Sequence, residues 1–464
     1  MEDMMSQHMI WASAMVGGIL GLLVLVKAPE FMVAGLLVGQ DFVQFAMTLV
    51  GFHITRRTFA QAGAVIFIPV VVLFIIMRML HMREDQPLIG RRNIMWVMLT
   101  VVMGIILIIG LTYTEAGFYG AKKTEEYFVF GFAPMMLVFV FVRDAASVRR
   151  LIFWIALLCC AMITLVSVYS LATRGSLQGT LMFLTRSGGE EVGGMEITGH
   201  GALSSDVVYL LAICLALAAA HTSGKWKLLP ILALPITAFY ILRAGTRSNL
   251  LAFLAIAIIG FFLAYRDRLG VFLVALLFLA LLAGIFVATA DSEIQERMLS
   301  SWIAEGTIAG GGGHTRVEIL MLAPGQIAQA PLFGHGTGGW VMLTHGMDVY
   351  DYPHNMFVEM FIENGAIGFG ILIGIWGFVA VRVVHCLRAA PVGSWLYGVG
   401  VLGVCILFVE LFSAGAHFGL AHHSCTLLIS SAVIMRSSVL IEAEDREQLE
   451  AAEVEETEPL VARV

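Results

Sequence analysis

Four polar residues interrupt an apolar stretch in the second half of the chain: His354, Asn355, Glu359 and Glu363. Pro353 predicts that a helix begins here, with His354 and Asn355 in its first turn. The two glutamates follow Asn355 at intervals of four residues, so all three share one helix face. A water-facing histidine titrates near neutral pH, and neutral His354 can accept a proton from an attacking hydroxyl group. We therefore predict that His354 and Asn355 are catalytic and that Glu359 contacts the substrate.

Three of these residues also have a plainer interpretation. His354 could instead be a capping or interfacial histidine. Carboxylates inside an apolar helix either have a function or are paired, and Glu359 could simply neutralise a nearby arginine. The role of Glu363 is left open between these alternatives.

Arginines beside apolar segments form the second group of candidates. Arg243 and Arg247 are four residues apart, Arg316 follows a glycine run at 310–313, and Arg186 lies in a polar segment. A guanidinium group beside the exposed N–H groups of a helix start favours a phosphate or pyrophosphate ligand. The alternatives are contact with lipid phosphates for Arg243 and Arg247, an ordinary ion pair for Arg316, and a plain surface position for Arg186.

The composition predicts that membrane-spanning helices position these residues. The chain of 464 residues is 59% hydrophobic and 13% charged, with a mean hydropathy of +0.89, which leaves too little polar surface for a soluble globule. Each span needs roughly 20 apolar residues. We predict an all-α polytopic membrane protein with about 12 transmembrane helices in one domain, 1–440. The number of spans in the first 80 residues is two or three.

The distribution of basic residues predicts which loops share a face. Loops rich in arginine and lysine lie on the cytoplasmic side of membranes. This rule leaves the outer face to the loops at 112–126, 171–200, 243–248, 289–355 and 413–420, of which 289–355 is the longest and contains helix-like pieces. Nine acidic residues between Glu442 and Glu458 predict a disordered cytoplasmic tail at 441–464.

No cofactor, metal or nucleic-acid partner is expected. The glycine runs fit neither the P-loop nor the dinucleotide-binding pattern, and the six cysteines lack metal-ligand spacing. Histidines of the outer face have no recognised zinc-ligand spacing either; they are His335, His345, His417, His422 and His423.

Several of these pieces together resemble the O-antigen ligase and polymerase superfamily. They are Gly245-Thr246-Arg247, Arg316, the turn Pro331-Leu332-Phe333-Gly334-His335-Gly336, and His354-Asn355 followed by Glu363-Asn364-Gly365-Ala366-Ile367-Gly368. The motifs cover 229–370, and the resemblance in topology covers the whole chain. Each piece alone is weak, whereas their combination is fairly specific.

The resemblance implies a metal-independent, inverting glycosyltransferase of the C type in the bacterial inner membrane, with its active site facing the periplasm. Its donor would be a glycan linked to undecaprenyl diphosphate, held by Arg247 and Arg316, with Arg186 as a weaker match. His354 would be the base. Ligases pass the glycan to lipid A-core and polymerases to another glycan; the motifs do not separate them, and we favour a ligase.

Two other classes of protein are weighed against this interpretation. A transporter or lipid flippase would use intramembrane acids such as Asp206, Glu359 and Glu410, but it predicts inverted repeats, and the sequence shows no such symmetry. If the protein were a non-enzymatic scaffold, the arginines of the outer face would have no assigned function.

Overall fold

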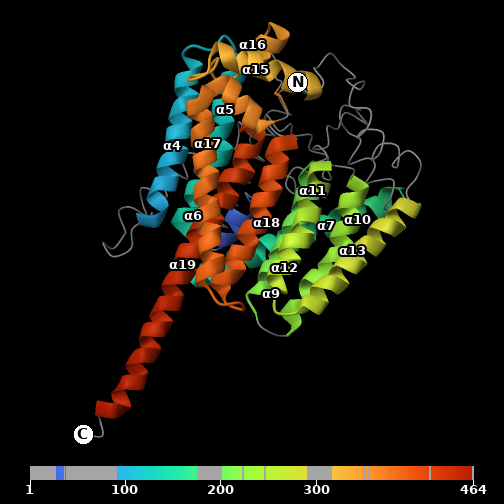
Figure 1. Ribbon diagram of the computed structural model, residues 1–464, viewed down its shortest axis with the longest axis vertical. Coiled ribbons are helices and arrows are strands. Elements are labelled where there is room, and N and C mark those ends of the chain that lie inside the picture. Colours follow the sequence, from blue (N-terminus) through green and yellow to red (C-terminus); the bar gives the residue numbers. More distant parts are fainter. Residues whose placement is uncertain are drawn as a thin grey trace, which may run out of the picture.

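The computed structural model describes residues 28–35, 37, 91–174, 201–221, 224–244, 247–289, 316–348, 352–353, 355–416 and 420–461. Within these ranges the regular structure is entirely helical (Figure 1). The elements are α4 (Arg91–Leu111), α5 (Gly117–Glu126), η1 (Tyr127–Phe132), α6 (Ala133–Phe141), α7 (Ala145–Arg174), α9 (Gly201–Ala219), η2 (Lys225–Leu228), α10 (Leu229–Ala244), α11 (Arg247–Ala255), η3 (Ile256–Gly260), α12 (Phe261–Ala264), α13 (Leu269–Thr289), α15 (Arg316–Gln329), α16 (Gly339–His345), α17 (Met356–Ala389), α18 (Trp395–Ala416) and α19 (Leu420–Val461).

The described helices confirm a multi-pass membrane protein. Six of them are long and apolar enough to cross a bilayer, and three shorter apolar helices accompany them. The six are Arg92–Leu111, Gly117–Phe141, Ala145–Leu165, Met356–Ala389, Trp395–Gly415 and Thr426–Ala451. The sequence predicts spans at about 93–111, 127–142, 151–170, 202–220, 228–242, 249–264, 270–288, 356–381, 394–412 and 421–436, and described helices occur in each of these ranges. The total of about 12 remains a prediction, because 1–27 and 38–90 lie outside the described residues.

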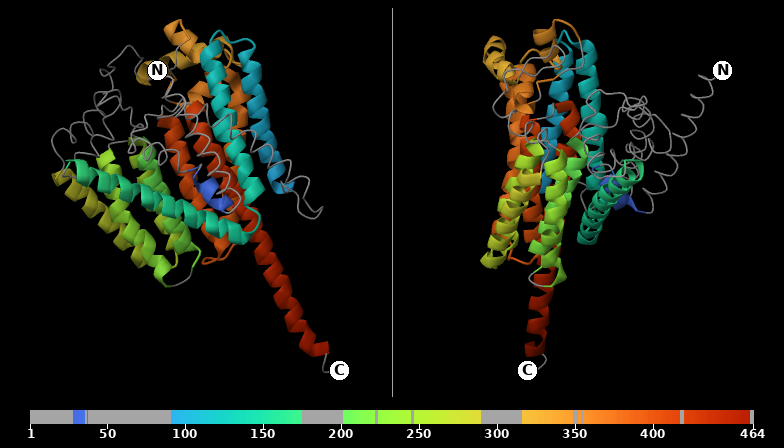
Figure 2. Two further views of the ribbon diagram at one scale, coloured as in Figure 1. Left: turned by 180° about the vertical axis from the view of Figure 1, so that it is seen from behind. Right: turned by 90° about the vertical axis from the view of Figure 1, so that its right-hand side faces the viewer.

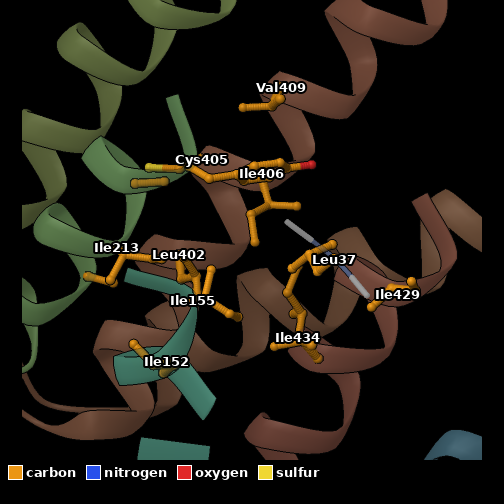
Figure 3. Packing of buried hydrophobic residues seen from close by; sticks show 14 of the residues in the cluster. Leu37, Ile152, Ile155, Ile213, Leu402, Cys405, Ile406, Val409, Ile429 and Ile434 are labelled. Carbon is orange, nitrogen blue, oxygen red and sulfur yellow. The ribbon is translucent and has the colours of Figure 1, made fainter. Parts of the chain in front are cut away.

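Apolar side chains lie both inside the bundle and on its outer surface. Ile155 of α7, Ile213 of α9, Leu402 of α18 and Ile434 of α19 lie close together in the interior (Figure 3). On the outside, α13 exposes large aliphatic side chains such as Leu277. This arrangement suits a helix that faces lipid, since a bilayer solvates apolar side chains. Seen from behind, α7 lies obliquely against α9 (Figure 2).

Four connections meet at one end of the bundle, which we call the basic end. Three of them contain arginine or lysine, namely 142–150, 219–228 and 264–268, and the fourth, 389–397, follows Arg388. The N–H of Gly393 donates to the Ala219 carbonyl at 3.0 Å, and the Tyr397 hydroxyl donates to Leu263 O at 2.9 Å. The guanidinium of Arg149 lies 5.4 Å from the centre of the Trp395 ring. The sequence predicted that these connections share a face, and in the structure they are in contact.

The opposite end, which we call the turn end, is made by 111–120, 316–348 and 352–365. Helices α15 and α16 lie over the ends of α4, α5 and α17 there (Figure 1). The Asp348 carboxylate caps α5 by accepting from the N–H groups of Phe118, at 2.6 Å, and Tyr119, at 3.0 Å. The helix-like piece predicted inside 289–355 is α15. The described part of this segment therefore packs onto the bundle.

Residues 441–461 differ from the sequence expectation of a disordered tail. Helix α19 continues without a break to Val461 and leaves the bundle at the basic end (Figures 1 and 2). The tail is rich in Glu and Ala, which are good helix formers. It also follows an existing helix, so it adds residues to a helix that is already nucleated. Glu442 is anchored by Arg382 of α17, at 2.5 Å.

Candidate active site

Helix α17 is broken at Gly365. This residue has φ 63° and ψ −165°, a backbone conformation that only glycine adopts without strain. A Cβ atom added there would lie 2.2 Å from the carbonyl oxygen of Leu332. The break therefore needs glycine both for its conformation and for the close approach of another segment.

That segment is the turn at 331–336, which supplies the hydrogen bonds that the break removes from α17. The N–H of Ala366 donates to Pro331 O at 2.9 Å, and the N–H of Gly336 donates to Glu363 O at 2.8 Å. The N–H of His335 donates to Ile362 O at 2.9 Å. An unpaired backbone group costs several kcal/mol inside a membrane domain. The two glycine-containing motifs that were noted separately in the sequence thus form one structural unit.

The turn is also fastened to α4 and to the connection that follows it. The Thr337 hydroxyl donates to Leu107 O at 2.9 Å. The Tyr113 hydroxyl donates to Phe333 O at 2.7 Å, and burial raises the pKa of this phenol. His335 lies 2.9 Å, through Nε2, from the carbonyl oxygen of Gln326 in α15. These contacts fix residues 331–337 between α4, α15 and α17. We call this segment the plug.

A buried ionic cluster lies behind the start of α17. The ammonium of Lys123 in α5 donates to both oxygens of Glu363, at 2.7 and 2.6 Å, and pairs with Oε1 of Glu359. All three side chains are 0% exposed. The ammonium also lies 4.6 Å from the centre of the Tyr119 ring. We call Lys123, Glu359 and Glu363 the ionic cluster.

Asn355 caps α17. Its side-chain oxygen accepts from the N–H groups of Phe357, at 3.0 Å, and Val358, at 3.1 Å, which satisfies two donors of the first turn. Its side-chain amide donates to Gly415 O, near the end of α18, at 3.1 Å. The geometry thus uses both ends of the Asn355 amide for structure, and its catalytic role stays a prediction.

Sequence reasoning missed Lys123. It placed this residue in an outer loop at 112–126, whereas the structure places it in the second turn of α5, inside a candidate span. Glu359 does pair with a cation, as the plainer interpretation held, but the cation is this lysine. An available signal was the charged run from Lys122 to Glu126 directly before an apolar run, because neighbouring helical residues point in different directions, so that one of the two lysines can face the interior.

The broken helix and its plug lie in a region that is recognisable by comparison with known proteins. Residues 231–373 match a family model described as O-antigen ligase. This region belongs to the O-antigen ligase and polymerase superfamily. The O-antigen ligase region runs from α10 to the middle of α17, so it contains the 331–337 plug and both glutamates of the ionic cluster. A search of curated proteins found no match to the chain.

Three predicted arginines of the O-antigen ligase region lie at the limits of the described helices. Arg243 is in the last described turn of α10, Arg247 is the first described residue of α11, and Arg316 is the first described residue of α15. Helix α10 begins at the basic end and α12 ends there, so Arg243 and Arg247 lie toward the turn end. Their side chains, together with Arg186 and His354, lie outside what the structure describes.

Proposed function

We propose that this protein transfers a glycan from an undecaprenyl-diphosphate-linked donor to an acceptor on the periplasmic side of the bacterial inner membrane. The observation that carries the proposal is the match of 231–373 to the O-antigen ligase family. Lipid A-core is the acceptor in the ligase form that we favour. A polymerase of the same superfamily would instead use a second glycan as acceptor.

The positions of Arg247 and Arg316 support a role in binding the donor diphosphate. Each is the first described residue of its helix, and at a helix start unpaired N–H groups and the helix dipole create positive potential. A cation at this position is unfavourable without an anion. A diphosphate would be attracted by the guanidinium and by the helix start together. Arg243 and Arg186 are assigned to the same ligand as weaker contributors.

The proposed reaction is a direct displacement at the anomeric carbon. The acceptor hydroxyl oxygen forms a bond to this carbon while the bond from the carbon to the diphosphate oxygen breaks. His354 accepts the hydroxyl proton, and undecaprenyl diphosphate leaves with its added negative charge, which the arginines stabilise. The configuration inverts because the nucleophile enters opposite the leaving group. The sequence offers no acidic DxD motif for a divalent ion, which agrees with charge stabilisation by arginine.

The test of this function is a transfer assay with the purified protein in lipid nanodiscs. The donor is an undecaprenyl-diphosphate-linked glycan, and lipid A-core and a second lipid-linked repeat unit are offered in separate reactions. Loss of a general base costs roughly 10²- to 10⁴-fold in rate, so His354→Ala should lose activity to that extent. Arg247→Ala and Arg316→Ala should each weaken donor binding, measured by native mass spectrometry.

Matched controls come from the far end of α17. His385→Ala and Arg388→Ala remove the same side-chain types at the basic end and should leave transfer and binding unchanged. Full activity of His354→Ala would remove the proposed base, and unchanged binding by both arginine variants would remove the diphosphate site. Transfer to lipid A-core identifies a ligase, and transfer only to a second repeat unit identifies a polymerase.

A further inference from the structure

The ionic cluster ties the first two turns of α17 to helices that are distant in sequence. Lys123 connects α5 to α17 through its contacts with Glu359 and Glu363. Glu359 also connects α17 to α19, because its Oε2 accepts from the N–H of Leu420, at 2.7 Å. The start of α17 is therefore held against α5 and α19 by a residue one turn after Asn355.

Two further sets of hydrogen bonds hold the start of α17 in place. The Asn355 amide joins the same turn to α18 at Gly415 O. Two turns further along, the 331–336 turn is hydrogen-bonded across the break at Gly365. Helices α5, α18 and α19 and the 331–336 turn thus each contribute a polar contact to the first turns of α17. His354 precedes Asn355 directly, so its backbone is joined to this fastened turn.

Stability alone is a poor reason for such a cluster. Removing three charged groups from water is costly, and apolar side chains of similar volume often serve a folded core as well or better. One ammonium faces two carboxylates, so the charges do not balance within the cluster. What the ionic contacts add is direction, because each carboxylate must reach the same ammonium, and this fixes the rotation of α17 about its axis.

We propose that Lys123, Glu359 and Glu363 are positioning residues that set the start of α17 and thereby the location of His354. This inference rests on the proposed function. It assigns Glu359 to positioning rather than to contact with substrate, because its carboxylate is fully buried and faces Lys123 and the Leu420 N–H. The cluster acts on the reaction through His354 and does not touch the donor or the acceptor.

The main test replaces all three charges together, so that no charge is left buried without a partner. Lys123→Met, Glu359→Gln and Glu363→Gln in one chain keep the approximate shape of each side chain. We expect the triple variant to fold and to bind the lipid diphosphate as the wild type does. Because a small misplacement of a catalytic group costs up to roughly 100-fold, we expect kcat to fall by roughly 10- to 100-fold.

A second readout does not depend on catalysis. The N–H groups of Phe357 and Val358 are bonded to Asn355, and we expect their hydrogen exchange to become faster in the triple variant. The matched control is Lys122→Met with Glu126→Gln, which removes a partly exposed ion pair one residue away. This control should change neither kcat nor exchange at 357–358.

If the triple variant does not fold, the single variant Glu359→Gln replaces it in both measurements. It leaves Lys123 and Glu363 as a balanced pair and should give a smaller fall in kcat with the same acceleration of exchange. A folded variant with wild-type kcat and wild-type exchange would overturn the positioning role. If instead His354→Ala is fully active, the proposed function fails, while faster exchange at 357–358 would still support the structural part of the inference.

Discussion

The two ends of the bundle both pair cations with glutamates, but they do so in opposite surroundings. At the basic end, Glu442 accepts from Arg92 and Arg446, whose side chains are 49% and 58% exposed, and from Arg382. At the turn end, Lys123 meets Glu359 and Glu363 with all three side chains fully buried. The basic end therefore shares its charges with water, whereas the ionic cluster is shielded from water.

This difference decides how each end responds to the loss of a charge. When a cation is lost at the basic end, Glu442 keeps other partners and access to solvent. When Lys123 is lost, two carboxylates remain in a fully buried site. The basic end is thus tolerant of substitution and the turn end is not, although the same residue types occur at both.

The largest effect is expected for Lys123→Met. Removing one partner of a buried ion pair costs about 3 to 5 kcal/mol, because the other charge is left uncompensated. The matched control is Lys122→Met, which removes the neighbouring lysine from a partly exposed pair with Glu126 and should cost less than about 1 kcal/mol. Both values are measurable as free energies of unfolding in bicelles. Equal costs for the two variants would show that the cluster is not isolated from water.

An intermediate effect is expected for Gly365→Ala. A residue other than glycine in this backbone conformation costs on the order of 1 to 3 kcal/mol, and the added Cβ must also displace the Leu332 carbonyl. Gly370→Ala is the control in the same helix, where the structure places nothing within 4 Å of the new Cβ. The control should raise the melting temperature slightly, because alanine favours helix. If the Gly365→Ala protein has the same melting temperature as the Gly370→Ala protein, α17 does not need the break at Gly365.

The contrast between the ends also explains what the sequence could and could not predict. Apolar runs of the right length locate the helices, because a span of hydrocarbon needs an unbroken apolar segment. Basic loops identify one end, since that signal is local in sequence. The pairing of Lys123 with Glu363 joins residues 240 positions apart, and no local pattern specifies it.

Two further features depend on contacts between segments that are distant in sequence, which a local sequence pattern does not predict. The turn at 331–336 and the residues around Gly365 are each visible as glycine motifs, but only the fold shows that one satisfies the hydrogen bonds of the other. The tail after residue 441 has the composition of a disordered segment. Its helical state depends on the span that precedes it and on the contact between Glu442 and Arg382.

The smallest effect is expected for Arg446→Ala at the basic end. Arg446 contacts Glu442 at 2.6 Å from one turn further along α19, and exposed pairs of this spacing contribute roughly 0.3 to 0.5 kcal/mol. The glutamate keeps Arg92 and Arg382, so no charge is stranded. The cost should shrink further as salt is raised, because exposed charges are screened. Unfolding of Arg446→Ala and wild type at low and high salt measures this directly. A cost of several kcal/mol that is insensitive to salt would mean that Glu442 is as isolated as the ionic cluster, and the distinction between the two ends would fail.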